Sequence, residues 1–190
     1  MASAAIDVQD LEINGVKLIK TRKFGDHRGF FSETYSRKDF FEAGIDIEFV
    51  QDNHSLSSAI HTVRGLHFQL PPFAQDKLVR VIRGAIFDVA VDLRNGSSTY
   101  GKYVSAIISA DGWNQILVPV GFAHGFMTME PDTEVIYKVS NYYSPEHDRG
   151  VLWNDRDLAI DWPNKTEIHL SEKDGKLPTF RSLPELFNER

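Results

Sequence analysis

The sequence predicts a mainly β protein, arranged as a sandwich or as a jelly-roll barrel. Short segments rich in β-branched and aromatic residues recur along the chain. Gly, Asn, Pro and Asp turn signals separate them, and very little of the chain has a helical pattern. With 190 residues the chain is long enough for one well-buried domain and marginal for two. We therefore expect a single domain over residues 1–190.

The predicted strands follow one another along most of the chain. In order, they are residues 16–19, 30–35, 49–55, 62–68, 78–82, 85–93, 103–109, 115–118, 126–129 and 134–139. Asn95-Gly96 and Asp111-Gly112 are turn dipeptides between them. In 85–93, alternate residues are apolar, so that face of the strand should be core; these residues are Phe87, Val89, Val91 and Leu93.

Helix is expected at two places only. A short helix is predicted near residues 36–43, with Ser36 as its N-cap and Gly44 as its stop. Ser171 and Asp174 resemble a capping box, although Glu or Gln is the usual acidic partner in that motif. This spacing predicts a short helical segment near the C-terminus.

Composition narrows the class of protein. The formal net charge of −6 argues against a general affinity for nucleic acid or for anionic membranes. No apolar run is long enough to cross a bilayer, and residues 1–7 lack the pattern of a signal peptide. The absence of cysteine excludes disulfides and thiolate nucleophiles and is compatible with a reducing compartment, so we expect a cytoplasmic protein.

Polar residues recur on strand faces where a purely structural core would be apolar. Gln51, Asn53 and Ser55 share one face, and Tyr137 shares a parity with Asn141 and Tyr143. An unpaired buried polar group costs about 1–3 kcal/mol. These faces therefore either line a ligand cavity or lie in solvent.

His67 is the first candidate for chemistry. It lies on a strand-like segment shortly after Arg64 and before Lys77. An imidazole beside positive charge suits a site that binds an anion and moves protons. A histidine taken alone is more often a hydrogen-bonded structural residue, so the neighbouring cations carry this interpretation.

Several motifs in a fixed order strengthen this interpretation of His67. They are FGDHRGFF at 24–31, QDNHS at 51–55, VRGLHFQ at 63–69, QDKLVR at 75–80, GFAHGF at 121–126 and Tyr137-Lys138. Together they closely resemble the dTDP-4-dehydrorhamnose 3,5-epimerase family, over about residues 24–174. The resemblance implies a cupin-type jelly roll. It also implies an isomerase that inverts C3 and C5 of dTDP-4-keto-6-deoxy-D-glucose, giving dTDP-4-dehydro-L-rhamnose for dTDP-L-rhamnose biosynthesis.

The resemblance also implies catalytic roles. His67 is the general base, and Asp174 fixes its tautomer and steadies the imidazolium. Tyr137 is the acid that returns a proton to the opposite face of the sugar, and Lys77 stabilises the enolate oxygen. Each residue also has a structural interpretation: Asp174 as a helix cap, Tyr137 as a packing residue and Lys77 as a strand-edge lysine.

Substrate-binding residues follow from the same motifs. They are Arg28, Glu33, Gln51, Asn53, Arg64, His124, Tyr143 and Lys173, with the arginines suited to pyrophosphate and Tyr143 to stacking on thymine. In the family the N-terminal strands, with Arg28 and Glu33, come from the neighbouring subunit, which implies a homodimer. Without the resemblance, Arg28 would be interpreted as a surface arginine in a turn.

No cofactor is expected. Deprotonation next to an existing ketone moves no hydride, so the reaction needs no nicotinamide, and no Gly-rich phosphate loop is present. The main rival within the fold is a metal cupin, but the sequence has no His-x-His pair, so we expect no metal.

Two departures from the family pattern bear on substrate preference. Asp76 stands where glycine is usual, and it would pair with Lys77 or alter the loop. Asp148 stands where many members have glutamate. A single-centre epimerase and a non-catalytic sugar-nucleotide-binding domain remain alternatives, and the presence of both His67 and Tyr137 favours catalysis.

Overall fold

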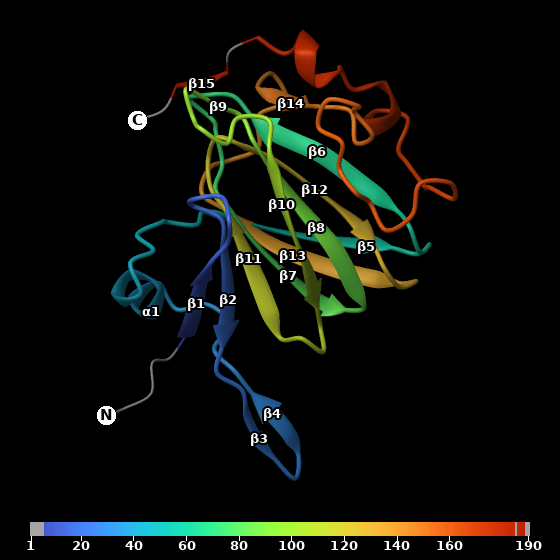
Figure 1. Ribbon diagram of the computed structural model, residues 1–190. Coiled ribbons are helices and arrows are strands. Elements are labelled where there is room, and N and C mark those ends of the chain that lie inside the picture. The colour runs from blue at the N-terminus through green and yellow to red at the C-terminus, as the bar shows by residue number, and fades with distance from the viewer. Residues whose placement is uncertain (1–5, 185, 189–190) are drawn as a thin grey trace.

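Two antiparallel sheets face each other in the computed structural model, which describes residues 6–184 and 186–188 (Figure 1). The six-stranded sheet has, in spatial order, β1 (Ile6–Asp10), β2 (Lys17–Thr21), β11 (Asn114–Val118), β7 (Lys77–Arg83), β13 (Thr133–Val139) and β5 (Gln51–Ser57). The five-stranded sheet has β10 (Tyr103–Ser109), β8 (Ala85–Asp92), β12 (Phe122–Thr128), β6 (Val63–Gln69) and β14 (Asp148–Gly150). Neighbouring strands are mostly distant in sequence, and the mainly β prediction is confirmed.

The core forms three apolar layers. Between the sheets lie side chains such as Val79 and Ile86. The outer face of the five-stranded sheet is covered by the chain that follows β14, residues 151–184 and 186–188, here called the C-terminal segment. Trp153 and Trp162 are among its buried side chains. The outer face of the six-stranded sheet is partly covered by α1 (Arg37–Glu42), through Phe40. Because both sheets are close-packed against these layers, the strands hold the side chains between them in fixed positions.

Strand β8 is buried on both faces. Val89 and Val91 pack under the C-terminal segment, which confirms the predicted core face. Ile86 and Ala90, on the other face, are buried between the sheets. The sequence predicts only one face of this strand as core. Burial of the second face also encloses Asp88, whose side chain therefore needs a hydrogen-bond partner.

The helical predictions are confirmed. The Ser36 hydroxyl accepts a hydrogen bond from the Asp39 amide at 3.4 Å, and Gly44 has a φ of +83° just after the helix. The C-terminal segment contains two 3-10 turns, η1 (Asp174–Lys176) and η2 (Phe180–Ser182). The first of them places Asp174 against β6, as described below.

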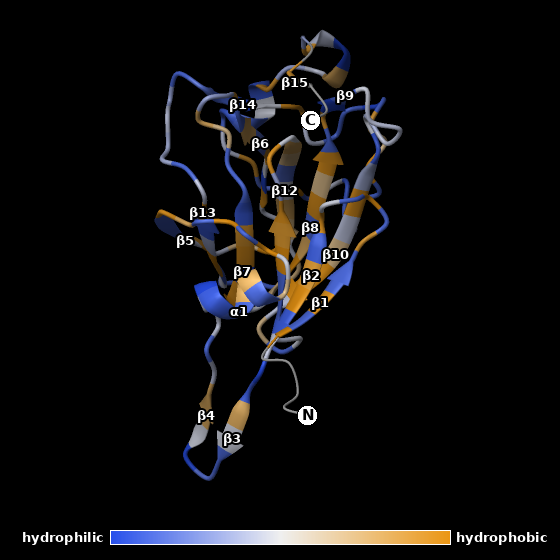
Figure 2. Ribbon diagram, turned by 90° about the vertical axis from the view of Figure 1, so that its left-hand side faces the viewer, coloured by the Kyte–Doolittle hydropathy of each residue, from blue (hydrophilic) through white to orange (hydrophobic). Residues whose placement is uncertain are grey.

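The predicted strand at 30–35 is wrong in its extent. Residues 32–35 form no strand. A hairpin of β3 (Phe24–Asp26) and β4 (Gly29–Phe31) projects away from the body instead (Figures 1 and 2). Phe30 and Phe31 are exposed on this hairpin. Its aromatic content predicts a packed strand, but Phe30 packs edge-on against Trp113, with the ring centroids 4.9 Å apart, and still remains 56% exposed.

The other differences are short strands that the sequence does not predict and shifts at strand ends. β1, β14 and two short strands that pair with each other in parallel, β9 (Arg94–Asn95) and β15 (Phe187–Asn188), were not predicted. β12 begins earlier than expected, since Gly125 lies within a strand where β6 passes close by. β13 ends at Val139, so Asn141 and Tyr143 lie in the following loop and share no strand face with Tyr137.

Candidate active site

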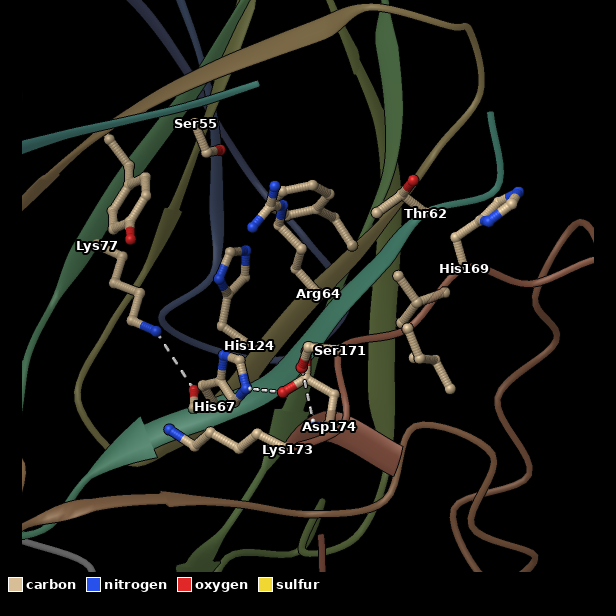
Figure 3. Close-up of a pocket in the computed structure, with 14 residues that line it drawn as sticks. Ser55, Thr62, Arg64, His67, Lys77, His124, His169, Ser171, Lys173 and Asp174 are labelled. Atoms are coloured by element: carbon tan, nitrogen blue, oxygen red, sulfur yellow. Dashed lines mark hydrogen bonds and ion pairs between the residues drawn. The ribbon is translucent and has the colours of Figure 1, made fainter. Parts of the chain in front are cut away.

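A cavity of about 490 Å³ opens beside β6 and is lined by side chains from both sheets (Figure 3). Its polar lining includes Ser55, Arg64, His67, Lys77, His124, Tyr137, Lys173 and Asp174. An adjoining cavity of about 270 Å³ shares His67, Lys77 and Tyr137 with it. The second cavity is also lined by Gln51, Asn53, Gln69, Gln75, Tyr143 and Asp148. Most of the predicted site residues therefore gather in one continuous region.

His67 and Asp174 form a close pair. The Nε2 atom of His67 lies 2.6 Å from Oδ1 of Asp174, although the two residues are 107 positions apart in the chain (Figure 3). His67 is partly exposed to the cavity, whereas the Asp174 side chain is buried. This geometry suits a carboxylate that orients an imidazole and stabilises its protonated form.

Asp174 is held by further hydrogen bonds. Its Oδ2 accepts from the Gly65 amide at 3.3 Å, and its own amide donates to the Ser171 hydroxyl at 3.0 Å. Burial raises the pKa of Asp174, but the hydrogen bond and charge of His67, with the Gly65 and Ser171 bonds, outweigh it and leave the pKa below its ordinary value. The capping arrangement and the contact with His67 thus coexist in one residue.

Tyr137 reaches the cavity from the other sheet. It lies on β13, and β6, which carries His67, belongs to the five-stranded sheet. Burial raises the pKa of the Tyr137 hydroxyl, Arg64 lowers it and Asp148 raises it again, with a net increase. The phenol is therefore protonated at neutral pH and available as a proton donor.

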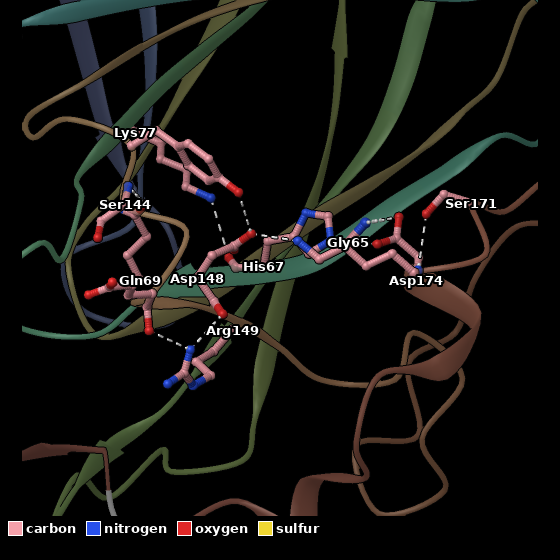
Figure 4. Close-up of polar contacts among 12 residues, drawn as sticks. Gly65, His67, Gln69, Lys77, Ser144, Asp148, Arg149, Ser171 and Asp174 are labelled. Atoms are coloured by element: carbon pink, nitrogen blue, oxygen red, sulfur yellow. Dashed lines mark hydrogen bonds and ion pairs between the residues drawn. The ribbon is translucent and has the colours of Figure 1, made fainter.

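Lys77 lies beside the His67 backbone. Its Nζ donates to the His67 carbonyl at 3.3 Å (Figures 3 and 4). Burial lowers the pKa of Lys77 to about 8, while the charges of Asp148 and Asp88 act in the opposite direction. At neutral pH Lys77 is a weakly solvated cation facing a cavity, which suits stabilisation of a developing oxyanion.

His124 has a buried carboxylate of its own. Its Nε2 lies 2.9 Å and 3.1 Å from the two Asp88 oxygens, and Asp88 is fully buried. His124 is also the cross-strand neighbour of His67. Sequence reasoning missed Asp88. The available signal is a carboxylate that alternates with Ile86 and Ala90, on the face of this strand opposite the predicted core face.

Asp148 is a second missed site residue. Its Oδ2 accepts from the Tyr143 hydroxyl at 3.1 Å and pairs with the Lys173 ammonium (Figure 4). The Asp148 side chain is only 13% exposed. The sequence marks its position only as a departure from the family pattern. Only the fold brings it next to Lys173.

The remaining cavity residues are held by local bonds. Arg64 donates from Nε to the Ser57 hydroxyl at 3.0 Å and from Nη2 to the Leu56 carbonyl at 2.9 Å. Gln51 donates to the Asn53 side chain at 2.9 Å. Gln51 and Asn53 share the inward face of β5 with Ser55. For this strand the structure confirms the prediction that the polar face lines a cavity.

Arg28 and Glu33 lie apart from this cavity. Arg28 is on the projecting hairpin, with its side chain 78% exposed and paired with Asp26. Glu33 is exposed just beyond the hairpin. The fold of one chain therefore does not bring them to the other predicted site residues.

Asp76 does not pair with Lys77. Its carboxylate accepts from the Val120 amide at 2.9 Å and from the Ser140 hydroxyl at 2.8 Å. These bonds tie the start of β7 to the segments that follow β11 and β13. The effect of this departure is therefore on the strand ends around Lys77.

Within residues 6–184 and 186–188, no group of three or more His, Cys, Asp or Glu side chains is placed to hold a metal ion. The same residues include no helix long and apolar enough to span a membrane.

The jelly-roll fold and a cavity that places an imidazole–carboxylate pair across from a phenol define an acid–base isomerase. The chain belongs to the dTDP-4-dehydrorhamnose 3,5-epimerase family, whose model matches residues 10–182. It is 58% identical to dTDP-4-dehydrorhamnose 3,5-epimerase from Sinorhizobium fredii over 179 residues, covering 94% of this chain and 92% of that protein. The cupin-type fold and the isomerase class predicted from the motifs are thereby confirmed.

Solved structures of dTDP-sugar epimerases are also similar to this chain. The Bacillus anthracis dTDP-4-dehydrorhamnose 3,5-epimerase, crystallised with TDP and PPi, is 52% identical with a TM-score of 0.89, covering 92% of this chain and 99% of that one. A Legionella pneumophila dTDP-6-deoxy-D-glucose-3,5-epimerase in complex with dTDP-4-keto-L-rhamnose is 38% identical with a TM-score of 0.93. That match covers 97% of this chain and 99% of that one.

Proposed function

We propose that this protein inverts C3 and C5 of dTDP-4-keto-6-deoxy-D-glucose and yields dTDP-4-dehydro-L-rhamnose. The observation that carries the proposal is the His67–Asp174 pair, which shares one cavity with Tyr137 from the opposite sheet. Inversion requires removal of a proton on one face and its return on the other, and a base alone would restore the original centre. A binding domain needs no such pair.

Each step of the reaction has a candidate residue. His67 removes the proton from the carbon next to the C4 ketone, and the electron pair moves onto the ketone oxygen to form an enolate. Asp174 stabilises the imidazolium that results. Lys77 stabilises the enolate oxygen. Tyr137 then donates its proton to the opposite face, and solvent restores the proton of the phenol. The same groups act at the second carbon.

Substrate contacts are proposed for the other predicted residues. Arg64 and Lys173 supply positive charge for the pyrophosphate, and Tyr143 offers an exposed ring for the thymine base. Gln51, Asn53 and His124 supply polar groups along the two adjoining cavities. The ligand names of the two solved relatives support a thymidine diphosphate sugar as the ligand.

We further propose a homodimer in which Arg28 and Glu33 reach the cavity of the neighbouring copy. The support is the β3–β4 hairpin, which projects from its own chain with exposed Phe24, Phe30 and Phe31 (Figure 2). We also propose that residues 1–190 form a single domain. A cytoplasmic location is compatible with the absence of cysteine.

The test is incubation with dTDP-4-keto-6-deoxy-D-glucose in deuterated water, followed by NMR. We expect deuterium at C3 and C5 and accumulation of the inverted sugar. Exchange at one carbon would assign a single-centre epimerase. Binding of dTDP without exchange at either carbon would assign a non-catalytic binding domain.

A further inference from the structure

Gln69 is a buried amide whose side chain is engaged entirely with backbone atoms. It lies on β6 two residues after His67 and is 4% exposed. Its Nε2 donates to the Phe73 carbonyl at 2.6 Å and to the Tyr142 carbonyl at 3.1 Å, and its Oε1 accepts from the Ser144 amide at 2.7 Å. Both N–H donors are used, so Gln69 has no donor left for a ligand.

These bonds hold the two residues that flank Tyr143. The Tyr142 carbonyl lies on one side of Tyr143 in the chain and the Ser144 amide on the other, and Figure 4 shows Ser144 next to Gln69. The Tyr143 amide donates to Oε1 of Gln51 at 3.4 Å, and its hydroxyl donates to Asp148 at 3.1 Å. Tyr143 as a whole is 56% exposed, so these bonds hold its backbone while the residue stays accessible to a ligand.

The position of this ring relative to the reaction centre depends on β6. Residues two apart on a strand point to the same face, so His67 and Gln69 both face the cavities. The cavity lined by Tyr143 and Gln69 shares His67 and Lys77 with the reaction cavity. One strand therefore carries the candidate base and also the amide that holds the loop of the candidate stacking residue.

We propose that Gln69 is a positioning residue that fixes Tyr143 before the substrate arrives and so sets the affinity for the nucleoside diphosphate part of the substrate. The proposal rests on the proposed function, in which Tyr143 contacts the base. A ring that is already in place needs no ordering of its loop on binding, and such preorganisation contributes to affinity. Loss of the amide frees the loop and returns that ordering cost to the binding step.

The experiment is a double-mutant cycle on dTDP binding, measured by isothermal titration calorimetry with the full chain. Gln69→Glu keeps the shape but replaces the donor by an oxygen that faces the Phe73 and Tyr142 carbonyls. Gln69→Leu removes the bonds without adding a charge, and it replaces Gln69→Glu in the cycle if that variant does not fold. Either variant should weaken dTDP binding by about tenfold, within the range that loss of one stacked base produces. In a Tyr143→Ala background the same change should have little further effect.

Asn114 provides a matched control. Its amide donates to the Ile107 carbonyl at 2.8 Å and accepts from the Ser109 amide at 3.1 Å, so it holds the residues that flank Ile108, away from both cavities. Asn114→Asp should leave dTDP binding unchanged. The turnover of the Gln69 variants at saturating substrate should stay within about threefold of the wild type, because the acid–base groups are untouched.

Two results would overturn the proposal. One is wild-type dTDP affinity in a folded Gln69 variant. The other is an equal loss of affinity in the wild-type and Tyr143→Ala backgrounds, which would indicate a merely structural role. Failure of the proposed function has a different signature, namely a wild-type protein that neither binds dTDP nor exchanges substrate hydrogen with solvent.

Discussion

At the residue scale, the surroundings of His67 and Tyr137 suit two different tasks. The imidazole of His67 has the Asp174 carboxylate at 2.6 Å, which holds the ring in one orientation. The phenol of Tyr137 is partly buried, which favours its neutral form. A base held in a fixed orientation and an acid that is protonated at neutral pH are the two groups that an inversion needs.

Substitution of these two residues should produce different failures. Tyr137→Phe keeps the ring and removes the hydroxyl, so substrate should still exchange hydrogen with deuterated solvent while inverted product does not accumulate. His67→Ala should abolish exchange and lower turnover by roughly 10²–10⁴, with dTDP binding little changed. NMR of the sugar distinguishes the two. Inverted product at the wild-type rate from Tyr137→Phe would assign the proton donor to another group.

Lys77 predicts an alkaline limit to activity. Because burial lowers its pKa to about 8, the ammonium is lost as pH rises through that value, and kcat/KM should fall above it. Asp148 raises the pKa of Lys77, so Asp148→Asn should move this limb to lower pH. The measurement is the pH profile of kcat/KM for both proteins. A wild-type profile that is flat up to pH 10 would exclude Lys77 as the charged stabiliser.

At the element scale, the close pairing of β6 and β12 sets the position of His67, the candidate base. Gly65 has a φ of +114°, and a Cβ atom there would lie 2.7 Å from the His124 carbonyl oxygen and 2.8 Å from the Gly125 Cα. The Gly65 amide also donates to Asp174. Only a residue without a side chain allows this approach, so the pair of glycines brings His67 and His124 side by side.

Gly65→Ala should therefore be costly. We expect a loss of about 2–4 kcal/mol in the free energy of unfolding, from the backbone conformation and the overlap together. Activity should fall as well, because His67 is two residues away. Gly175→Ala is the control, since no atom lies within 4 Å of its added Cβ. Chemical denaturation of both variants measures the difference, and equal stability would contradict the steric argument.

At the scale of the whole molecule, the projecting hairpin is the feature that one chain leaves unexplained. It carries exposed aromatic side chains, and Arg28 on it is far more exposed than the arginine of the cavity, Arg64. A large exposed apolar surface of this kind is typical of a protein–protein contact. The proposed homodimer covers it and supplies Arg28 to a second cavity.

Mixing of two inactive variants tests that exchange. When His67→Ala and Arg28→Ala chains are unfolded and refolded together, a mixed dimer has one site with both defects and one with neither. Random pairing should restore about a quarter of wild-type activity at low substrate. Each variant refolded alone is the control. No gain on mixing would indicate that each site takes Arg28 from its own chain or does not use it.

The sequence alone predicted most of the fold, because alternation and turn residues are local signals. The strand predicted at 103–109 coincides with β10, and Ser36 caps the helix as its spacing predicts. The ordered motifs predicted the family, and most of the catalytic and binding candidates line the two cavities. These properties depend on residue types at fixed spacings, and such spacings can be read along the chain.

Only the tertiary structure determined how these residues combine. The family resemblance implied that Asp174 partners His67, and the structure places the two atoms 2.6 Å apart. No local pattern indicates that Asp88 is buried against His124 or that Asp148 joins Lys173 to Tyr143. Each of these contacts depends on which strands and loops become neighbours in the folded chain. Polar pairing and desolvation are properties of packing, so they become defined once the two sheets and the C-terminal segment are in place.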